Sequence, residues 1–309
     1  MRNENPKISV CIPVYNAKDY IENTVACWVN QDFRDLEICI SDDDTDDGTW
    51  EILSGLAKRD ERVHLNRNPS NLGPKPNFRI AHDMARGDYV LWASDDDLYD
   101  KTYCSKLLAE LEANPDCKLA VSAYRRVSRR DGAFIKDVYY RGRLNPNHLS
   151  ALGTMLLCWP RSNAAALANG YAHFCMGLFR HGFVDALLRN DPTFMSRYDI
   201  KLPAMAAMCG GIRYVDEILV TKRIWQGRDK LPTLGGRGGT PTMAHKPRLK
   251  WWYETISSFL RAPMLPWYWK LAVPVVYFPV AFNEAKVMFV QYAYMYASKT
   301  LKQVQVYFR

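Results

Sequence analysis

The first hundred residues alternate short apolar runs with stretches of helical periodicity, and no other feature of this sequence constrains the fold as strongly. The apolar runs, which are typical of buried strands, occupy residues 8–12, 36–40, 63–65 and 89–92. Apolar residues at helical spacing fill the intervals, at residues 19–29, 49–56 and 77–86. This βαβαβαβ order predicts an α/β fold with a mostly parallel central sheet and helices on both faces.

Local signals refine these boundaries. Pro13 is expected to end the first strand, and Asp19 with Glu22 resembles a capping box at the start of the first helix. Beyond residue 100 the order is looser. There we expect a helix at 102–114 and extended segments at 118–123, 172–179, 212–215 and 218–224.

Aromatic and acidic residues follow the expected strand ends. They are Tyr15 after the first strand, residues 42–47 after the second and residues 95–97 after the fourth. Ligands of open parallel sheets bind beyond the carboxyl ends of the strands. One edge of the sheet is therefore expected to collect these residues.

The consecutive carboxylates of Asp95, Asp96 and Asp97 repel one another, so at the mouth of a core they need full solvation or a cation. Mg²⁺ is commonly held by one or two carboxylates together with substrate phosphates. A solvated acidic turn is the alternative. Neither GxGxxG nor GxxxxGK[ST] follows the first strand, which argues against dinucleotide and nucleoside triphosphate binding.

The charge of the chain is unevenly spread. Residues 201–309 hold 16 Lys and Arg against 5 Asp and Glu, whereas residues 1–200 hold 25 against 28. The basic C-terminal third favours an anionic partner, either a phosphate or a lipid surface. Nucleic acid is disfavoured as a partner, because no nucleic-acid motif is recognisable and the basic residues are scattered among aromatics.

Two further signals concern location. The start, residues 1–7, is polar and predicts no secretory signal peptide. The 8 cysteines contain no CxxC pair and favour buried thiols in a reducing cytosol. We therefore expect a cytoplasmic protein.

We expect three parts along the chain. Residues 1–225 form one α/β domain, with a first half at 1–100 and a second half at 101–225. Residues 226–247 are rich in Gly and Pro and form a loop that could act as a lid. Residues 248–309 form an aromatic, basic extension.

The extension at residues 248–309 contains an apolar run, 271–282, of only 12 residues. A spanning helix requires roughly 20. Aromatics and lysines beside a short apolar run suit a peripheral element on an anionic membrane surface, at the inner face of the cell membrane. A buried helical subdomain or a homodimer contact is an equal alternative.

Four motifs in order resemble the signatures of glycosyltransferase family 2. They are Ile8 to Asn16 (ISVCIPVYN), Ile40 to Thr49 (ISDDDTDDGT), Asn71-Leu72-Gly73 through Asn77, and Ala85 to Tyr89 (ARGDY) leading into Ser94 to Asp97 (SDDD). The resemblance covers about a hundred residues. It implies the GT-A fold, a nucleotide-sugar donor such as a UDP-sugar, a divalent Mn²⁺ or Mg²⁺ ion, and inversion at the anomeric carbon. It also implies that residues 1–225 are a catalytic domain, with a nucleotide-binding half at 1–100 and an acceptor half at 101–225.

The resemblance also assigns roles at the nucleotide end of the site. Pro13, Val14 and Tyr15 match the loop that packs on the base and ribose. Asp43 matches the acid that hydrogen-bonds the base, with Asp42 beside it as a helper. A helix N-terminal acid cluster is the alternative for the two aspartates.

In the metal motif, the resemblance makes Asp96 the principal metal ligand and places Asp95 near the ribose. Asp97 would assist the metal directly or through water. Such a metal would stabilise the negative charge that develops on the diphosphate leaving group. Lys75 could add a positive contact to the donor.

Inverting transfer requires a general base that takes the proton of the acceptor hydroxyl. The resemblance assigns this role to Asp199, which precedes a helical pattern and Gly210-Gly211, although the family's usual preceding Glu is replaced by Tyr198. Asp191 is the fallback. Where many members carry a His, this chain has Arg223-Ile224-Trp225, and Arg223 is expected to hold the diphosphate instead.

Together these features predict a metal-dependent, inverting glycosyltransferase. It would transfer a hexosyl or N-acetylhexosaminyl group to a glycan or lipid-linked glycan, as a step of surface polysaccharide biosynthesis. A nucleotidyltransferase that makes nucleotide sugars is the alternative enzyme, but it should carry a Gly-rich phosphate loop where this chain has Pro13 to Asn16. A non-catalytic sugar- or metal-binding protein of the same fold is the alternative from another class.

Overall fold

The computed structural model describes residues 5–139, 171–191 and 198–224, and a few positions between 257 and 270. For residues 171–173 and 198–200 it describes the backbone only. The expected loop at 226–247 and nearly all of the extension at 248–309 lie outside the described residues. Among the described residues, no helix combines the length and apolar character needed to cross a bilayer.

The chain divides into two compact units, residues 1–240 and 241–309. The described residues of the first unit form a sheet of nine strands. Its first four strands run parallel in the order β3, β2, β1, β4. They span Ile8–Val14 (β1), Leu36–Asp42 (β2), Val63–Arg67 (β3) and Tyr89–Trp92 (β4).

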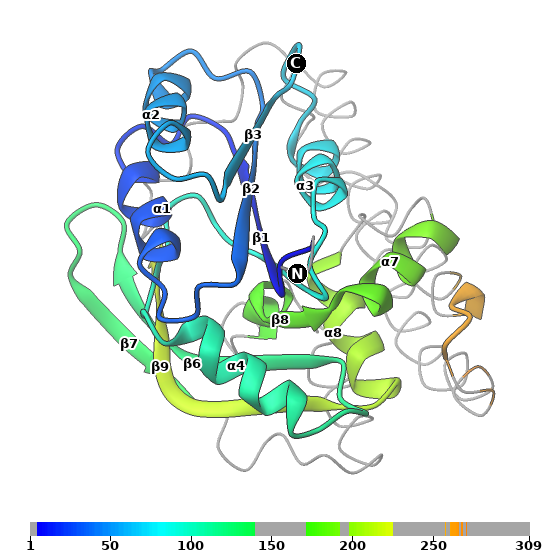
Figure 1. The fold of residues 1–309 in the computed structure, drawn as a ribbon. Helices are drawn as coiled ribbons and strands as arrows, with labels where there is room; N and C mark the ends of the chain where they lie inside the picture. The colour runs from blue at the N-terminus through cyan, green and yellow to red at the C-terminus, as the bar shows by residue number, and fades with distance from the viewer. Residues whose placement is uncertain are drawn as a thin grey trace, which may run out of the picture. The chain divides into compact units, whose positions relative to one another are not determined.

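Three helices connect these strands and cover both faces of the parallel half, with α1 and α2 on one side and α3 on the other (Figure 1). They span Ile21–Val29 (α1), Thr49–Ala57 (α2) and Pro74–Asp83 (α3). Every residue of β1, β2 and β4 is buried, so the parallel strands form the centre of the core. The α/β fold class expected from the sequence is thereby confirmed.

Beyond β4 the sheet continues in the order β8, β6, β9, β5, with β7 paired to β6. Only β6 and β9 run parallel to each other here, and the other pairs are antiparallel. The elements are Leu98–Tyr99 (β5), Tyr103–Glu112 (α4), Leu119–Ser128 (β6), Phe134–Val138 (β7), Tyr171–Met176 (3₁₀ helix η1), Leu178–Arg180 (β8), His181–Asn190 (α7), Tyr198–Met208 (α8) and Ile212–Ile224 (β9).

Pro13 does not end the first strand, because β1 continues to Val14. The pairing of β1 with β4 stops at Cys11, while its pairing with β2 runs on through Pro13 and Val14. Past Cys11 the strand therefore has a ladder partner on one side only. A proline, which has no N–H to donate, is tolerated at such a position.

Two other local predictions are wrong. Helix α1 starts at Ile21, and its N-cap Tyr20 makes no side-chain capping hydrogen bond, so Asp19 and Glu22 form no capping box. The segment expected to be extended over 172–179 is instead the 3₁₀ helix η1 followed by the short strand β8. Residues 212–215 and 218–224 belong to one strand, β9, which pairs irregularly with β6 near Ala123.

A buried carboxylate explains why the residues that precede β4 are fixed. The Glu37 side chain accepts hydrogen bonds from the Arg86 backbone N–H at 2.7 Å and from the Arg86 guanidinium at 2.6 and 3.0 Å. Ser9 Oγ donates to Glu37 at 2.7 Å and accepts from the Gly87 N–H at 2.8 Å. This network joins β1, β2 and the turn into β4, so part of the ARGDY motif holds the sheet together.

Candidate active site

The ends of β1, β2 and β4 bring the expected site residues to one edge of the sheet. Pro13 and Val14 close β1, Asp42 closes β2, and residues 94–97 follow β4. The backbone N–H of Tyr15 donates to Asp95 Oδ2 at 3.4 Å, which ties the loop after β1 to the loop after β4. The geometry therefore joins two of the four sequence motifs directly.

Asp96, the expected metal ligand, is nearly buried, with 6% of its surface exposed. Its Oδ1 accepts a hydrogen bond from Ser94 Oγ, and its Oδ2 forms an ion pair with the Arg129 guanidinium. The Arg223 guanidinium donates to the backbone carbonyl of Asp96. Two arginines thus converge on Asp96, Arg129 at the carboxylate that the sequence assigns to a cation and Arg223 at the backbone carbonyl.

Asp97 is buried and also faces cations. Its Oδ1 accepts from the Arg223 backbone N–H at 2.9 Å, and its Oδ2 lies 3.8 Å from Lys222 Nζ. Thr24 Oγ1 in α1 donates to the Asp97 carbonyl at 3.0 Å and so fixes the turn. This geometry makes Asp97 a bridge between the loop after β4 and the end of β9.

In the acid cluster, which is Asp95 to Asp97, two carboxyl groups have raised pKa values, those of Asp95 and Asp97. Burial, reinforced by the negative charge of Asp96, raises the pKa of Asp95 to about 7. Burial also raises the pKa of Asp97 to about 6, with Lys222 opposing the shift and Asp96 adding to it. Crowded, desolvated carboxylates with raised pKa values are common at functional sites.

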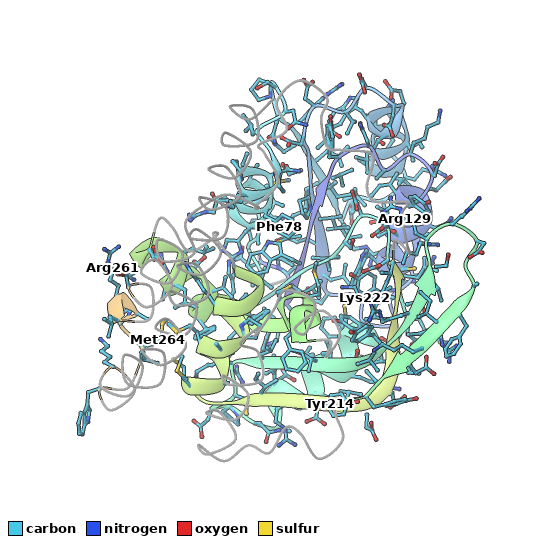
Figure 2. The ribbon with its side chains drawn as sticks, turned by 180° about the vertical axis from the view of Figure 1, so that it is seen from behind. Phe78, Arg129, Tyr214, Lys222, Arg261 and Met264 are labelled. Atoms are coloured by element: carbon cyan, nitrogen blue, oxygen red, sulfur yellow. The ribbon has the colours of Figure 1, made fainter. Side chains whose placement is uncertain are left out.

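Arg129 is the site residue that sequence reasoning missed. The strand expected at 118–123 extends as β6 to Ser128, and Arg129 follows it directly. Strands β6 and β9 are paired up to Ser128 and Ile224, so their ends deliver Arg129, Lys222 and Arg223 together. Arg129 and Lys222 are labelled in Figure 2. The signal available was the basic run after the predicted strand.

Both arginines stack on one aromatic ring. The Arg129 and Arg223 guanidinium carbons lie 4.4 and 5.2 Å from the centroid of the Tyr20 ring. Stacked guanidiniums remain free to donate hydrogen bonds in the ring plane, which suits them to phosphate and carboxylate groups. Tyr20 therefore positions two cations over the acid cluster.

Asp43 organises the loop that carries the Asn71-Leu72-Gly73 motif. Its Oδ1 accepts from Asn68 Nδ2 at 2.8 Å and from the Leu72 N–H at 2.9 Å, and its Oδ2 accepts from the Gly73 N–H at 2.9 Å. Gly73 has a φ of 84°, a conformation that favours glycine. These contacts connect the second and third sequence motifs. The expected hydrogen bond from Asp43 to a base remains a prediction.

Asp42 is fully buried and serves the turn after β2. Its Oδ1 accepts from Thr45 Oγ1 at 2.7 Å, and Arg67 Nε lies 3.5 Å from its Oδ2. Burial raises the pKa of Asp42, although Thr45 and Arg67 oppose the shift. These contacts give it a structural role beside Asp43.

The remaining expected residues are less closely connected to the acid cluster. Lys75 is exposed near the start of α3. Asp199 lies in the first turn of α8, as the base assignment expects, and its side chain is outside the described part of the chain. The fallback Asp191 is buried, with Oδ2 at 3.9 Å from the Nζ of the buried Lys201.

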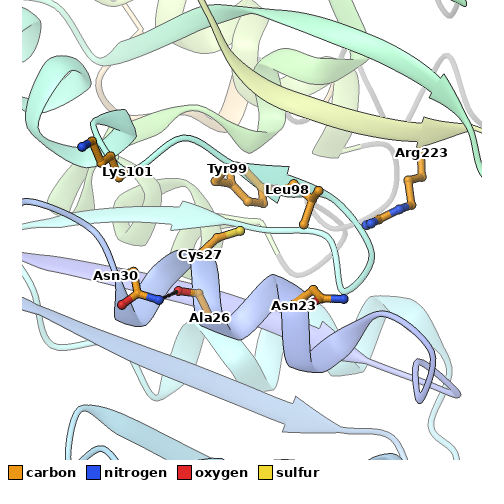
Figure 3. A pocket seen from close by; sticks show the side chains of 8 residues that line it. All are labelled: Asn23, Ala26, Cys27, Asn30, Leu98, Tyr99, Lys101 and Arg223. Atoms are coloured by element: carbon orange, nitrogen blue, oxygen red, sulfur yellow. Dashed lines mark hydrogen bonds between the residues drawn. The ribbon is translucent and has the colours of Figure 1, made fainter. Parts of the chain in front are cut away.

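A cavity of about 370 Å³ adjoins the acid cluster. Helix α1 lines it with Asn23 and Cys27, and the β5 region with Leu98 and Tyr99. Figure 3 shows Arg223 reaching in from β9 toward α1. Arg223 lines the cavity and also donates to the Asp96 carbonyl, so it connects the cavity to the acid cluster. The volume is within the range of small-molecule sites.

The acid cluster fits a hard divalent cation in its donor chemistry. Asp96 and Asp97 offer carboxylate oxygens, the donors that Mg²⁺ and Mn²⁺ prefer. One oxygen of Asp96 is paired with Arg129. A diphosphate brought in with the cation would give Arg129 a replacement anion, so the two positive groups need not compete for Asp96.

Several known proteins are similar in sequence. Residues 9–161 match the family described as glycosyl transferase family 2. GalNAc(5)-diNAcBac-PP-undecaprenol beta-1,3-glucosyltransferase of Campylobacter jejuni is 39% identical over 94 residues, which are 30% of each chain. The putative teichuronic acid biosynthesis glycosyltransferase TuaG of Bacillus subtilis is 36% identical over 124 residues, 40% of this chain and 49% of its own. The matches span less than half the length of these relatives.

Two solved structures are similar in fold. S. aureus TarS, in a complex with UDP, superposes with a TM-score of 0.60 at 16% identity, covering 87% of this chain and 69% of that chain. The mannosyltransferase PcManGT of Pyrobaculum calidifontis, in complex with GDP-Man and Mn²⁺, gives 0.54 at 16% identity, covering 94% and 76%. At this identity the likeness concerns the fold, and it confirms the expected GT-A architecture.

Proposed function

Because residues 9–161 belong to glycosyl transferase family 2, we propose that this protein transfers a sugar from a nucleotide-diphosphate donor to a hydroxyl of a glycan, with inversion at the anomeric carbon. The donor class is supported by the fold neighbours, whose complexes hold UDP in one case and GDP-Man with Mn²⁺ in the other. A UDP-sugar is the first donor to test.

One observation carries this proposal. The acid cluster, Asp95 to Asp97, lies at the carboxyl end of β4 and directly faces Arg129 and Arg223 from the ends of β6 and β9. Acids and arginines placed together at a sheet edge suit a diphosphate that carries a divalent cation.

The roles follow from the chemistry of the leaving group. Departure of the nucleoside diphosphate develops negative charge, and Arg129, Arg223 and Lys222 are placed to stabilise it. A bound Mg²⁺ or Mn²⁺, held by Asp96 with Asp97, would supply further Lewis-acid stabilisation of the same charge. Tyr15 and Asp95 would hold the nucleoside end.

The proton of the acceptor must leave as its oxygen attacks. Asp199, at the start of α8, is the proposed base that accepts it. Asp191 suits the task less well, because it is buried and lies beside the cation of Lys201.

A donor panel tests the activity. The protein would be incubated with UDP-, GDP- and dTDP-sugars and Mn²⁺, and release of nucleoside diphosphate measured. The wild type should release it from at least one donor, and Asp96→Ala should lose the activity. Asp46→Ala is the matched control, since Asp46 is an exposed acid of the neighbouring turn. Failure of every donor to bind or react would contradict the enzyme assignment.

A second comparison tests the base. Asp199→Asn should keep donor binding and lose transfer, whereas Asp191→Asn should retain transfer if it folds. Full transfer by Asp199→Asn would refute this role.

The setting that we propose is surface polysaccharide assembly on a lipid-linked acceptor, at the inner face of the cell membrane. It is supported by the names of the relatives, one of which acts on an undecaprenol-linked glycan while another is assigned to teichuronic acid biosynthesis. A matching acceptor would be required for transfer in the assays above.

A further inference from the structure

Two histidines and an aspartate meet between α3 and α7, away from the acid cluster. His82 lies near the end of α3, while His181 and Asp185 lie in the first turns of α7. One ligating atom from each residue falls within 4.8 Å of the others. We propose that these residues form a zinc-type transition-metal site that fastens α7 to α3.

The distances match the spacing of ligands around one metal ion. Asp185 Oδ1 lies 3.0 Å from His82 Nε2 and 3.4 Å from His181 Nε2. In a tetrahedral site with bonds of about 2.0–2.1 Å, neighbouring ligand atoms stand about 3.3 Å apart. Small side-chain adjustments therefore suffice to seat an ion.

The helix geometry presents two of the ligands together. His181 and Asp185 are four residues apart, so they share a face of α7. The same i, i+4 spacing places two ligands on a helix in known zinc sites. His82 completes the set from α3, and two imidazoles with one carboxylate are donors that zinc accepts, the fourth position being left to water.

A backbone carbonyl orients the His181 ring. Its Nδ1 lies 2.7 Å from the Gly87 carbonyl, which can only accept, so Nδ1 donates there and Nε2 faces the cluster. Metal-bound histidines are usually oriented by such a hydrogen bond.

His82 is the most deeply buried member of the cluster. It is 2% exposed, and no described group satisfies its Nδ1. Its Nε2 now donates to Asp185 Oδ1. A metal ion bound at Nε2 would take the place of the proton on that atom. The proton of the neutral ring would then be carried on Nδ1. Arg189 contacts the other oxygen of Asp185, Oδ2, at 3.4 Å and leaves Oδ1 for the ion.

The location separates this cluster from the proposed donor site. His181 is anchored to the carbonyls of Gly87 and Asp88, which precede β4, whereas Asp95 to Asp97 follow β4. The nitrogen-rich donor set also prefers zinc, while the carboxylates of the acid cluster prefer Mg²⁺ or Mn²⁺. The role inferred is structural: the ion would connect α3 of the parallel half to α7 of the later half.

The test uses the full chain without a histidine tag. The protein would be loaded with Zn²⁺, desalted and assayed for bound metal by mass spectrometry, and its thermal unfolding followed with and without Zn²⁺. One tightly bound equivalent and a raised Tm are expected. Co²⁺ should give the visible absorption of a tetrahedral nitrogen and oxygen site.

The variants are His181→Ala and the conservative Asp185→Asn, both checked for folding by circular dichroism. Each should lower zinc affinity at least tenfold and abolish the Tm gain. His64→Ala is the matched control, because His64 also lies near a carboxylate, 3.6 Å from Glu37, but belongs to no group of possible metal ligands among the described residues. It should bind zinc as the wild type does.

Two results would overturn the inference. One is a wild-type protein that holds no zinc after desalting. The three side chains would then join α3 and α7 through their hydrogen bonds alone. The other is equal zinc content in wild type, His181→Ala and Asp185→Asn, which would place the ion elsewhere. Asp96→Ala should leave the zinc equivalent unchanged, so the outcome does not depend on the proposed transferase activity.

Discussion

At the scale of single residues, adjacent acids in this protein have different tasks. Asp42 fixes the turn after β2, whereas Asp43 gathers the backbone N–H groups of the following loop. Motif residues of this kind shape the site before any ligand binds.

Arg129 gives the first prediction at this scale. The substitution Arg129→Ala should weaken UDP binding in the presence of Mn²⁺ about tenfold or more, because it removes a charge-assisted hydrogen bond, which contributes about 1.5–3 kcal/mol. Isothermal titration calorimetry would measure this. Arg125→Ala is the control on the same strand, because Arg125 pairs with Asp137 instead. Equal losses in both variants would argue against a specific role for Arg129.

A second prediction concerns pH and stability. Hydrogen bonds from Arg62 lower the pKa of Asp60 in the folded protein. The ionised Asp60 therefore stabilises the fold fully above its unfolded pKa of about 3.9. This contribution is lost as the pH falls through the lowered pKa of the folded state. Asp60→Asn should cost about 1 kcal/mol at pH 7. Urea unfolding at several pH values should show that the difference in free energy of unfolding between the wild type and Asp60→Asn vanishes in strong acid. A constant difference down to pH 2 would contradict it.

The positions of Asp43 and of Asp95 to Asp97 at the sheet edge were predictable, because these residues follow short, largely apolar strands. Their roles toward a donor stay predictions. The position of Arg129 was not predictable, because it depends on how far β6 continues past Ala123, and the polar residues Arg125 and Arg126 conceal that extension in the sequence.

At the scale of elements, the turn between α3 and β4 depends on a glycine. A Cβ at Gly87 would stand 2.9 Å from the Ile8 carbonyl carbon and from the Ser9 backbone N, atoms that cannot move without shifting β1. Gly87→Ala should therefore lower the free energy of unfolding by about 1–3 kcal/mol.

The matched control lies in α2. A Cβ at Gly55 would meet only the end of the Arg59 side chain, at 3.8 Å. Gly55→Ala should raise stability by about 0.5–1 kcal/mol through helix propensity. Denaturant unfolding of both variants checks this pair, and similar effects of the two substitutions would refute the steric account.

The elements of the parallel half were predictable because β1, β2 and β4 are short, largely apolar runs that alternate with helical periodicity. The short strands β5 and β8 were not, since two or three residues carry no periodicity. Their pairing depends instead on tertiary contacts with β9, β4 and β6.

At the scale of the whole molecule, charge separates the chain into a slightly acidic part and a strongly basic one. We predict that the full chain sediments with vesicles containing anionic phosphatidylglycerol and not with phosphatidylcholine alone. Binding should fall at 1 M salt, where the Debye length is about 3 Å. Equal binding to both vesicle types would show that the basic charge does not direct the protein to membranes.

The ion pair between Asp96 and Arg129 also links two binding equilibria. A cation arriving alone must compete with a guanidinium already in place, whereas a diphosphate offers that guanidinium another anion. Mn²⁺ and UDP should therefore each tighten the binding of the other by the same factor, as thermodynamic reciprocity demands. Calorimetric titration of Mn²⁺ with and without UDP would measure this cooperativity, and independent binding would exclude it. Loading of the protein would then depend on donor and metal together rather than on either alone.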